Sequence, residues 1–200
     1  MILDLNTKIL YIINSTTFMF ESGQNRKIAA LKTSKCVCFF IERRNIMQDH
    51  EYYMSIAMAQ DKKEFKKNEV PIGAIIVKNN KIISKAFNKT EKTNNGINHA
   101  EVLAIERATK KLKNWRLIDC TLYVTLQPCL MCTGAIIESR IKKVIYAAES
   151  NYLTEEEKQF IQNEFKKNEI IIHNGIQKDE SATLLNQFFK KRRKSKNHLK

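Results

Sequence analysis

The amino-acid sequence predicts an α/β fold in which helices cover both faces of a mixed β-sheet. Two short β-branched segments flank a tight polar turn, a pattern typical of an antiparallel hairpin. Strand-like and helix-like segments then alternate to the end of the chain, as they do in βα units. The chain of 200 residues is long enough to build one domain around a hydrophobic core, and short for two.

The predicted elements follow one another in a clear order. Residues 49–67 carry apolar side chains at near-helical spacing and are predicted to form a helix. The hairpin comprises VPIGAIIV and KIISKAF, joined by the turn KNNK. Helices are expected at 99–112, 129–139 and 154–168, with the strands TLYVTL and KKVIYAA before and after the second of them. The chain closes with the strand-like segment EIIIH and a helix over DESATLLNQFFKKRRK.

Residues 1–46 differ from the rest because they have no clean hydrophobic period. We expect them to be an N-terminal extension of unknown role, either disordered or the product of a misassigned start. The domain itself is placed at 47–200, with a basic C-terminal helix and tail. A transit peptide is the alternative, since the segment is basic and poor in acidic residues, although it is not clearly amphipathic.

The net charge of +14 favours a polyanionic partner such as nucleic acid, although part of it fits a compositional bias toward Lys, Asn and Ile. Residues 190–200 contain seven Lys or Arg residues and no acidic residue, which fits a solvated tail as well as a nucleic-acid contact. No apolar run approaches the length of a membrane span, and five cysteines fit no even disulfide framework. A soluble protein of a reducing compartment, the cytoplasm, is therefore expected.

Cys129 and Cys132 lie three residues apart behind Pro128, where a predicted helix follows a predicted strand. Alone, such a pair fits a disulfide, a redox switch, half of a metal site or chance. Residues at i and i+3 share one face of a helix, so both sulfurs can reach one point, and a helix N-terminus lowers the pKa of a thiol. His99, at the start of another predicted helix, adds an imidazole. Two thiolates and one imidazole form a ligand set suited to Zn²⁺.

Three protein ligands are one fewer than a structural zinc site requires. Cys120 is expected roughly 20–30 Å from Cys129, because the strand TLYVTL separates them. The open fourth position favours a catalytic metal, and Glu101 is a candidate to carry protons between water and substrate. Residues two apart on a regular helix do not face the same way, so this role requires His99 to lie at an irregular helix entry.

The segments HAE (99–101) and PCLMC (128–132) match the H-x-E…P-C-x-x-C signature of the zinc-dependent nucleobase deaminases. Over about residues 48–193, the chain resembles the family of bacterial tRNA-specific adenosine deaminases, most clearly in EVPIGAIIVKNNKII, NWRLIDCTLYVTLQPCLMCTGAII and LLNQFFKKRR. The resemblance implies a cytidine deaminase-like three-layer α/β/α fold with a five-stranded mixed sheet, usually in a homodimer. The implied reaction is the hydrolytic deamination of adenosine to inosine at the wobble position of an arginine tRNA.

The resemblance also implies roles for the residues of the signature. His99, Cys129 and Cys132 would hold one Zn²⁺ per subunit. Glu101 would pass protons to the purine ring and then to the leaving ammonia. The reaction class would be that of a hydrolase acting on carbon–nitrogen bonds of a cyclic amidine.

Five further residues match positions through which the family contacts its RNA substrate. Asn88, which alone would be a turn residue, matches an asparagine that contacts the target base. The backbone N–H of Ala100 matches a donor to the purine. The final helix, with Phe189, Arg192 and Arg193, matches a segment that faces the anticodon loop of tRNA, although its phenylalanines alone would be core residues.

Three positions depart from the family pattern. Gln127 stands where the family usually has Glu before the Pro-Cys pair, and Glu149 and Ser150 replace a basic–acidic pair. The departures concern a region that normally meets RNA, so the detail of the RNA contact is open there. Residues 1–46 have no counterpart in the family.

Two other functions are compatible with parts of this pattern. An enzyme of the same fold could deaminate a free nucleobase, a nucleoside or a riboflavin precursor, and it would not need the basic C-terminal helix. A non-catalytic partner subunit or RNA-binding module could keep zinc for structure, but such proteins usually lack the catalytic Glu, whereas Glu101 is present.

Overall fold

The computed structural model describes the backbone of residues 8–13, 16–21, 49–60 and 69–197. The chain divides into two compact units, Met1–Phe40 and Ile41–Lys200. In the first unit, β1 (Lys8–Ile13) pairs antiparallel with β2 (Thr16–Glu21), in a region to which the sequence pattern assigned no element. The domain boundary near residue 47 stays a prediction.

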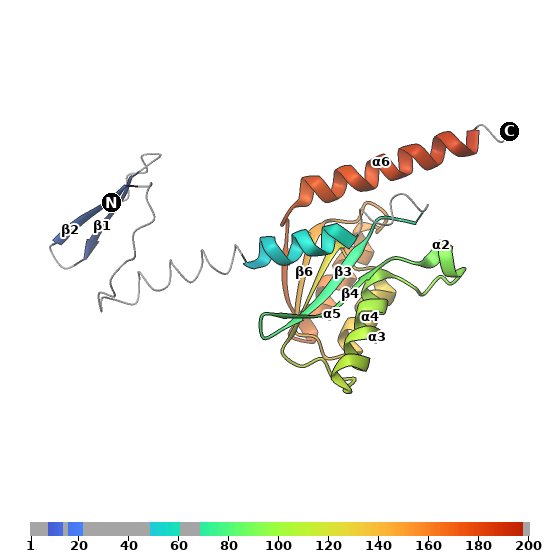
Figure 1. Ribbon diagram of the computed structural model, residues 1–200, viewed down its shortest axis with the longest axis horizontal. Helices are drawn as coiled ribbons and strands as arrows, with labels where there is room; N and C mark the ends of the chain where they lie inside the picture. The colour runs from blue at the N-terminus through green and yellow to red at the C-terminus, as the bar shows by residue number, and fades with distance from the viewer. Residues whose placement is uncertain (1–7, 14–15, 22–48, 61–68, 198–200) are drawn as a thin grey trace. The chain divides into compact units, whose positions relative to one another are not determined.

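The second unit is built on a five-stranded mixed sheet, as predicted (Figure 1). Its strands lie in the order β4-β3-β5-β6-β7. The pairs β4–β3 and β3–β5 are antiparallel, whereas β5–β6 and β6–β7 are parallel. The bounds of the strands are β3 Gly73–Lys78, β4 Lys81–Phe87, β5 Cys120–Leu126, β6 Lys143–Ala148 and β7 Ile171–Asn174.

The hairpin turn between β3 and β4 follows from its two asparagines. Asn79 and Asn80 have φ values of 49° and 57°, so both central residues occupy the left-handed region. Two successive positive φ values are the mark of a type I′ turn, whose twist matches that of the flanking strands. Asparagine tolerates this conformation better than most residues do, which explains why KNNK closes the hairpin.

Helices cover both faces of this sheet because its central strands alternate their buried side chains between the two. Ile76, Leu122 and Val144 pack with α3 (Ala100–Leu112), α4 (Leu130–Glu138) and α5 (Glu155–Lys167). Their neighbours in sequence, Tyr123 and Ile145 among them, pack on the opposite face against the helix over residues 49–60. Burying one aliphatic side chain of this size contributes about 1.5–3 kcal/mol, so both layers are firmly held.

The long C-terminal helix α6 (Lys178–Asn197) lies on the same face as the helix over 49–60. Its first turn is attached to β5, since Ser181 Oγ donates to the carbonyl of Thr125 over 2.6 Å. Gln177, just before the helix, donates to the carbonyl of Glu51 over 3.3 Å. Arg192, near its other end, pairs with Glu91 of the short helix α2 (Thr90–Thr93). The helix α6 therefore spans from the end of β5 to α2.

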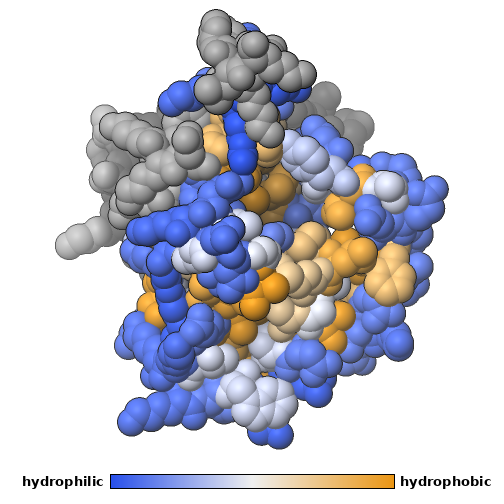
Figure 2. All heavy atoms as spheres, turned by 90° about the vertical axis from the view of Figure 1, so that its right-hand side faces the viewer, coloured by the Kyte–Doolittle hydropathy of each residue, from blue (hydrophilic) through white to orange (hydrophobic). Residues whose placement is uncertain are grey.

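Most expected elements differ from the observed ones by one or two residues at their ends, and residues 61–67 of the first predicted helix lie outside the described residues. The short helix α2 carried no sequence signal. Among the described residues, no helix combines the length and apolar character that crossing a membrane requires. Figure 2 shows a face on which apolar side chains gather in the hollowed centre, with hydrophilic side chains around them.

Candidate metal centre

Two helix entries meet beside the sheet and supply three metal-ligating side chains. His99 is the N-cap of α3, and Cys129 is the N-cap of α4. Both residues have extended backbone, with φ and ψ of −71° and 154° for His99 and −77° and 175° for Cys129. Cys132 follows one turn into α4, and its side chain is fully buried.

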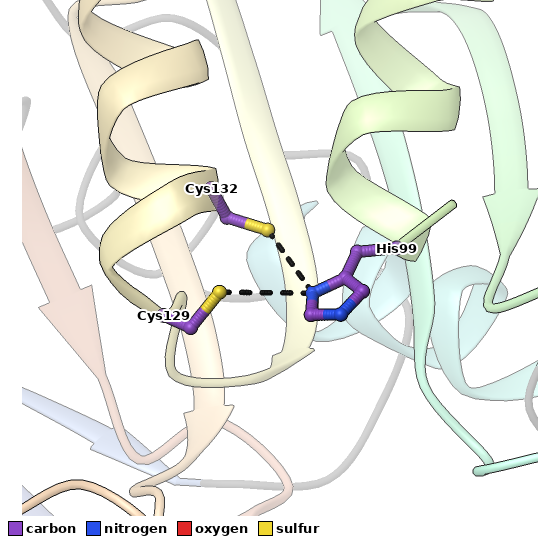
Figure 3. Close-up of side chains that lie close together, drawn as sticks. All are labelled: His99, Cys129 and Cys132. Atoms are coloured by element: carbon purple, nitrogen blue, oxygen red, sulfur yellow. Dashed lines mark hydrogen bonds between the residues drawn. The ribbon is translucent and has the colours of Figure 1, made fainter. Parts of the chain in front are cut away.

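The three side chains converge on one point (Figure 3). The Nδ1 atom of His99 lies 3.6 Å from Cys129 Sγ and 3.5 Å from Cys132 Sγ. All three candidate ligand atoms lie within 4.8 Å of one another. A tetrahedral zinc ion with usual Zn–N and Zn–S bonds keeps its nitrogen and sulfur ligands about 3.6 Å apart. Both the donor set and its spacing therefore fit Zn²⁺.

Cys120 does not join this group, as expected from its place in the sequence. It is the first residue of β5, whereas Cys129 comes after the end of the same strand. Its buried thiol interacts with the carbonyl of Ile118 at 3.8 Å, and burial raises its pKa. In the described part of the chain, the metal-ligating group contains only His99, Cys129 and Cys132.

Glu101 lies in the first turn of α3 and is almost completely buried. Burial raises the pKa of its carboxyl to about 7, although the backbone at the helix entry and the nearby His99 act in the opposite direction. The Cys132 thiol interacts with the carboxyl, so the acid contacts the ligand group directly. A carboxyl with this pKa can exchange protons near neutral pH.

The two thiols differ in acidity although they are close together. The hydrogen bond from Cys132 lowers the pKa of Cys129 to about 4, against the effect of burial. The same hydrogen bond, followed by burial, raises the pKa of Cys132. The hydrogen bond to Cys129 raises the pKa of His99. The pair therefore shares one proton, which a metal ion would displace.

Asn88 and Ala100 lie at the two ends of the segment that links β4 to α3. Asn88 is buried, donates its backbone N–H to Ile72 and donates its side-chain amide to Thr90 Oγ1 over 3.0 Å. Ala100 is buried and is the first residue of α3. The first N–H groups of a helix have no intrahelical acceptor, so that of Ala100 is suited to bind a ligand.

Glu69 supports this segment, and the sequence analysis gave it no role. Its carboxylate is fully buried and accepts the backbone N–H groups of Glu91 and Lys92 over 2.5 and 3.0 Å. It thereby caps α2, whose own N-cap residue, Lys89, makes no side-chain cap. A single Glu before a strand has no periodic signal, so only the fold brings it to this helix.

The remaining predicted residues lie on α6. Phe189 is half-buried, while Arg193 is exposed. Arg192 donates to Glu91 over 2.6 Å, which connects α6 with the segment that precedes His99. The distances between these residues and the ligand group remain outside the contacts described above, so their role in RNA binding stays a prediction.

Two positions that depart from the family pattern contact each other. The side-chain oxygen of Gln127 accepts the backbone N–H of Ser150 over 3.2 Å, and both residues are buried. The backbone N–H of Gln127 donates to Ala148, at the end of β6, over 2.8 Å. The segment after β6 is thus attached to the segment that carries Cys129.

Comparisons with known proteins agree with this arrangement. Residues 48–193 match the model of the MafB19-like deaminase family. A tRNA-specific adenosine deaminase of Buchnera aphidicola subsp. Schizaphis graminum is 41% identical over 145 residues, which are 71% of this chain and 95% of the relative.

Two solved structures are similar in fold. One comes from a study of A-to-I editing by tRNA:A34 deaminases at the wobble position, with 31% identity and a TM-score of 0.61. The match covers 67% of this chain and 99% of that one. A guanine deaminase from Nitrosomonas europaea has a TM-score of 0.62 at 22% identity and covers 69% and 83% of the two chains, which supports the fold alone.

Proposed function

Because this chain belongs to the MafB19-like deaminase family, we propose that it deaminates adenosine to inosine at the wobble position of a tRNA anticodon. The observation that carries the proposal is the match to a tRNA-specific adenosine deaminase along 95% of that protein's length. The match includes the ligand group and the acid beside it. An arginine tRNA is the proposed substrate, in agreement with the resemblance of the sequence to the tRNA deaminases.

His99, Cys129 and Cys132 are the proposed ligands of a zinc ion, through Nδ1 and two thiolates. When bound there, zinc supplies Lewis acidity that lowers the pKa of water and so provides a nucleophile near neutral pH. The fourth position is left to solvent, since the described residues offer three ligands at this point. This arrangement distinguishes a catalytic site from a structural one.

Glu101 is the proposed proton carrier. The reaction adds water across C6 of adenine and releases ammonia, so one proton must reach the ring nitrogen and another the leaving amine. Burial raises the pKa of the Glu101 carboxyl to about 7, which suits a group that first accepts and then donates a proton. Its place beside Cys132 keeps it next to the proposed metal.

The substrate base is proposed to be held by Asn88 and by the backbone N–H of Ala100. Both are buried next to the elements that carry the ligands, as a base turned out of its loop would require. On the surface, Phe189, Arg192 and Arg193 are proposed to contact the anticodon loop. The excess positive charge of the chain favours such binding.

The direct test incubates the purified protein with a tRNA or an anticodon stem-loop that carries adenosine at the wobble position. Reverse transcription and sequencing should then read guanosine at that position. The Glu101→Gln variant is the matched control and should leave the adenosine unchanged. Turnover of free guanine or cytosine, with an unchanged tRNA, would favour the alternative deaminase of a free nucleobase.

A homodimer and a cytoplasmic location complete the proposal. The dimer is proposed from the resemblance to the tRNA deaminases, and sedimentation of the purified protein would test it. The location is proposed because the ligand thiols must stay reduced to bind metal. A fusion to a fluorescent protein would test it, and an organellar signal would instead support the transit-peptide alternative for residues 1–46.

A further inference from the structure

Tyr152 is the most exposed large aromatic side chain in the described part of the chain, with 67% of its surface accessible. It follows β6 by four residues and packs its ring against Phe189 of α6, with ring centroids 5.3 Å apart and planes tilted by 56°. Phe189 in turn meets the buried Phe188 edge-on at 5.3 Å. One side of the tyrosine ring is therefore anchored to the fold while most of the residue faces solvent.

The backbone of Tyr152 is fixed to the segment that carries the metal ligands. Its N–H donates to Ser150 Oγ over 3.2 Å, and the N–H of Ser150 donates to the side chain of Gln127 over 3.2 Å. Gln127 lies two residues before Cys129. Ser150 and Gln127 are both buried, so these hydrogen bonds are shielded from water and hold the tyrosine at a set position.

Positive charge lies next to this aromatic pair. Arg193 is close enough to Tyr152 to act on its phenol, whose pKa burial otherwise raises. Arg192 lies three residues after Phe189, on the same side of the helix, and is held by Glu91 of α2. The pair thus stands on α6 between its attachment to β5, which leads to Cys129, and its attachment to α2, which leads to His99.

An exposed aromatic ring beside arginines is the combination with which proteins bind single-stranded nucleic acid, since bases stack on the ring and phosphates meet the cations. We propose that Tyr152, backed by Phe189, is a stacking platform for one unpaired base of the substrate RNA other than the edited adenine. This inference rests on the proposed function, because it names a contact to the same substrate. Ser150 and Gln127 hold the platform in place.

The alternative of a purely structural tyrosine has less support. A ring that keeps 67% of its surface exposed gains little from its contact with Phe189. A second protein could also cover an exposed aromatic ring, but the neighbouring arginines favour a polyanion. An effect of the substitution on oligomeric state, instead of RNA binding, would identify a protein partner.

The test measures binding of an anticodon stem-loop to wild type and to Tyr152→Phe, Tyr152→Ala and Tyr152→Leu by fluorescence anisotropy. Loss of one stacked base should weaken binding about 5- to 150-fold in the Ala and Leu variants, whereas Phe stays within about twofold. Tyr152→Leu keeps an apolar contact with Phe189, so it guards against a folding defect. Phe160→Ala, an exposed aromatic of α5 on the opposite layer, is the control and should bind as wild type does.

A series of stem-loops with one abasic loop position at a time then identifies the stacked base. One abasic RNA should bind wild type as weakly as the intact RNA binds Tyr152→Ala, with no further loss when the two changes are combined. Fully additive losses at every position, equal weakening in Tyr152→Phe, or dissociation of a dimer would overturn the inference.

Inosine formation by wild type separates the two levels of failure. If wild type converts the adenosine and Tyr152→Ala binds and reacts as wild type does, only the stacking platform is refuted. If wild type forms no inosine in any tRNA, the proposed function itself fails.

Discussion

His99 and Glu101 both contact the same pair of thiols although a single residue separates them in the chain. His99 lies outside α3, in extended backbone with φ of −71° and ψ of 154°, whereas Glu101 lies in the first helical turn. The change of backbone direction between them turns both side chains toward Cys129 and Cys132. The ligand and the acid therefore share one site but remain separable by mutation.

Replacing Glu101 by Gln should abolish inosine formation without removing the metal. The amide cannot carry a proton, so the rate should fall about 10²- to 10⁴-fold. Zinc content, measured by mass spectrometry, should stay at the wild-type value because Glu101 is not a ligand. The control Glu106→Gln changes an exposed residue of the same helix and should leave the rate unaltered. Loss of zinc in Glu101→Gln would contradict this division of roles.

Replacing Cys129 by Ser should remove most of the bound zinc and all measurable deamination. A hydroxyl is a much weaker zinc ligand than a thiolate, and two remaining ligands do not hold the ion. Cys120→Ser is the matched control, since Cys120 lies at the other end of β5 and should leave the zinc content unchanged. Equal zinc loss in the two variants would mean that the metal binds elsewhere.

His50 should make the protein less stable in mild acid. Burial, Lys143 and His173 lower the pKa of His50 in the folded chain, while Asp49 acts in the opposite direction. Its Nδ1 lies 2.8 Å from the Tyr123 hydroxyl. A lowered pKa favours the neutral ring in the folded state, so this stability is present above pH 6.5 and is lost as pH falls through the folded pKa.

The measurement compares urea unfolding of wild type and His50→Gln between pH 7.5 and 5. Glutamine keeps a polar partner for Tyr123 but does not titrate, so the free energy of unfolding should fall less steeply with acid in the variant. Parallel curves for the two proteins would show that His50 does not carry the effect.

Removing the Glu69 carboxylate should loosen the segment between β4 and α3. Glu69→Ala deprives the N–H groups of Glu91 and Lys92 of their acceptor, which should cost about 0.5–2 kcal/mol, as for a lost helix cap. Glu69→Gln keeps one acceptor oxygen and should lose less. Because this segment includes Asn88, KM for the RNA should rise in Glu69→Ala. A free energy of unfolding equal to that of wild type would refute the capping role.

Arg193→Gln should weaken RNA binding at low salt and make it less sensitive to salt. Each phosphate contact adds about one to the slope of log Kd against log salt, so the slope should fall by about one. Arg116→Gln removes the same charge from an arginine stacked on Trp115, before β5, and is the control. Identical slopes in all three proteins would exclude Arg193 from the interface.

The sequence by itself determined the five-stranded mixed sheet, because alternating apolar segments and turn residues are local signals. It also determined the ligand group: spacing within PCLMC placed both sulfurs on one helix face, and HAE supplied the imidazole. The condition that His99 lie at an irregular helix entry was stated from helix geometry alone, and its N-cap position meets it.

Only the tertiary structure decided which distant residues meet. Glu69 caps α2, Gln127 holds Ser150, and Arg192 joins α6 to α2, and none of these pairs has a local sequence pattern. Their partners lie 22 to 101 positions apart in the chain, so each contact depends on how strands and helices pack. Periodicity fixes the face on which a side chain lies, whereas packing fixes the partner across that face.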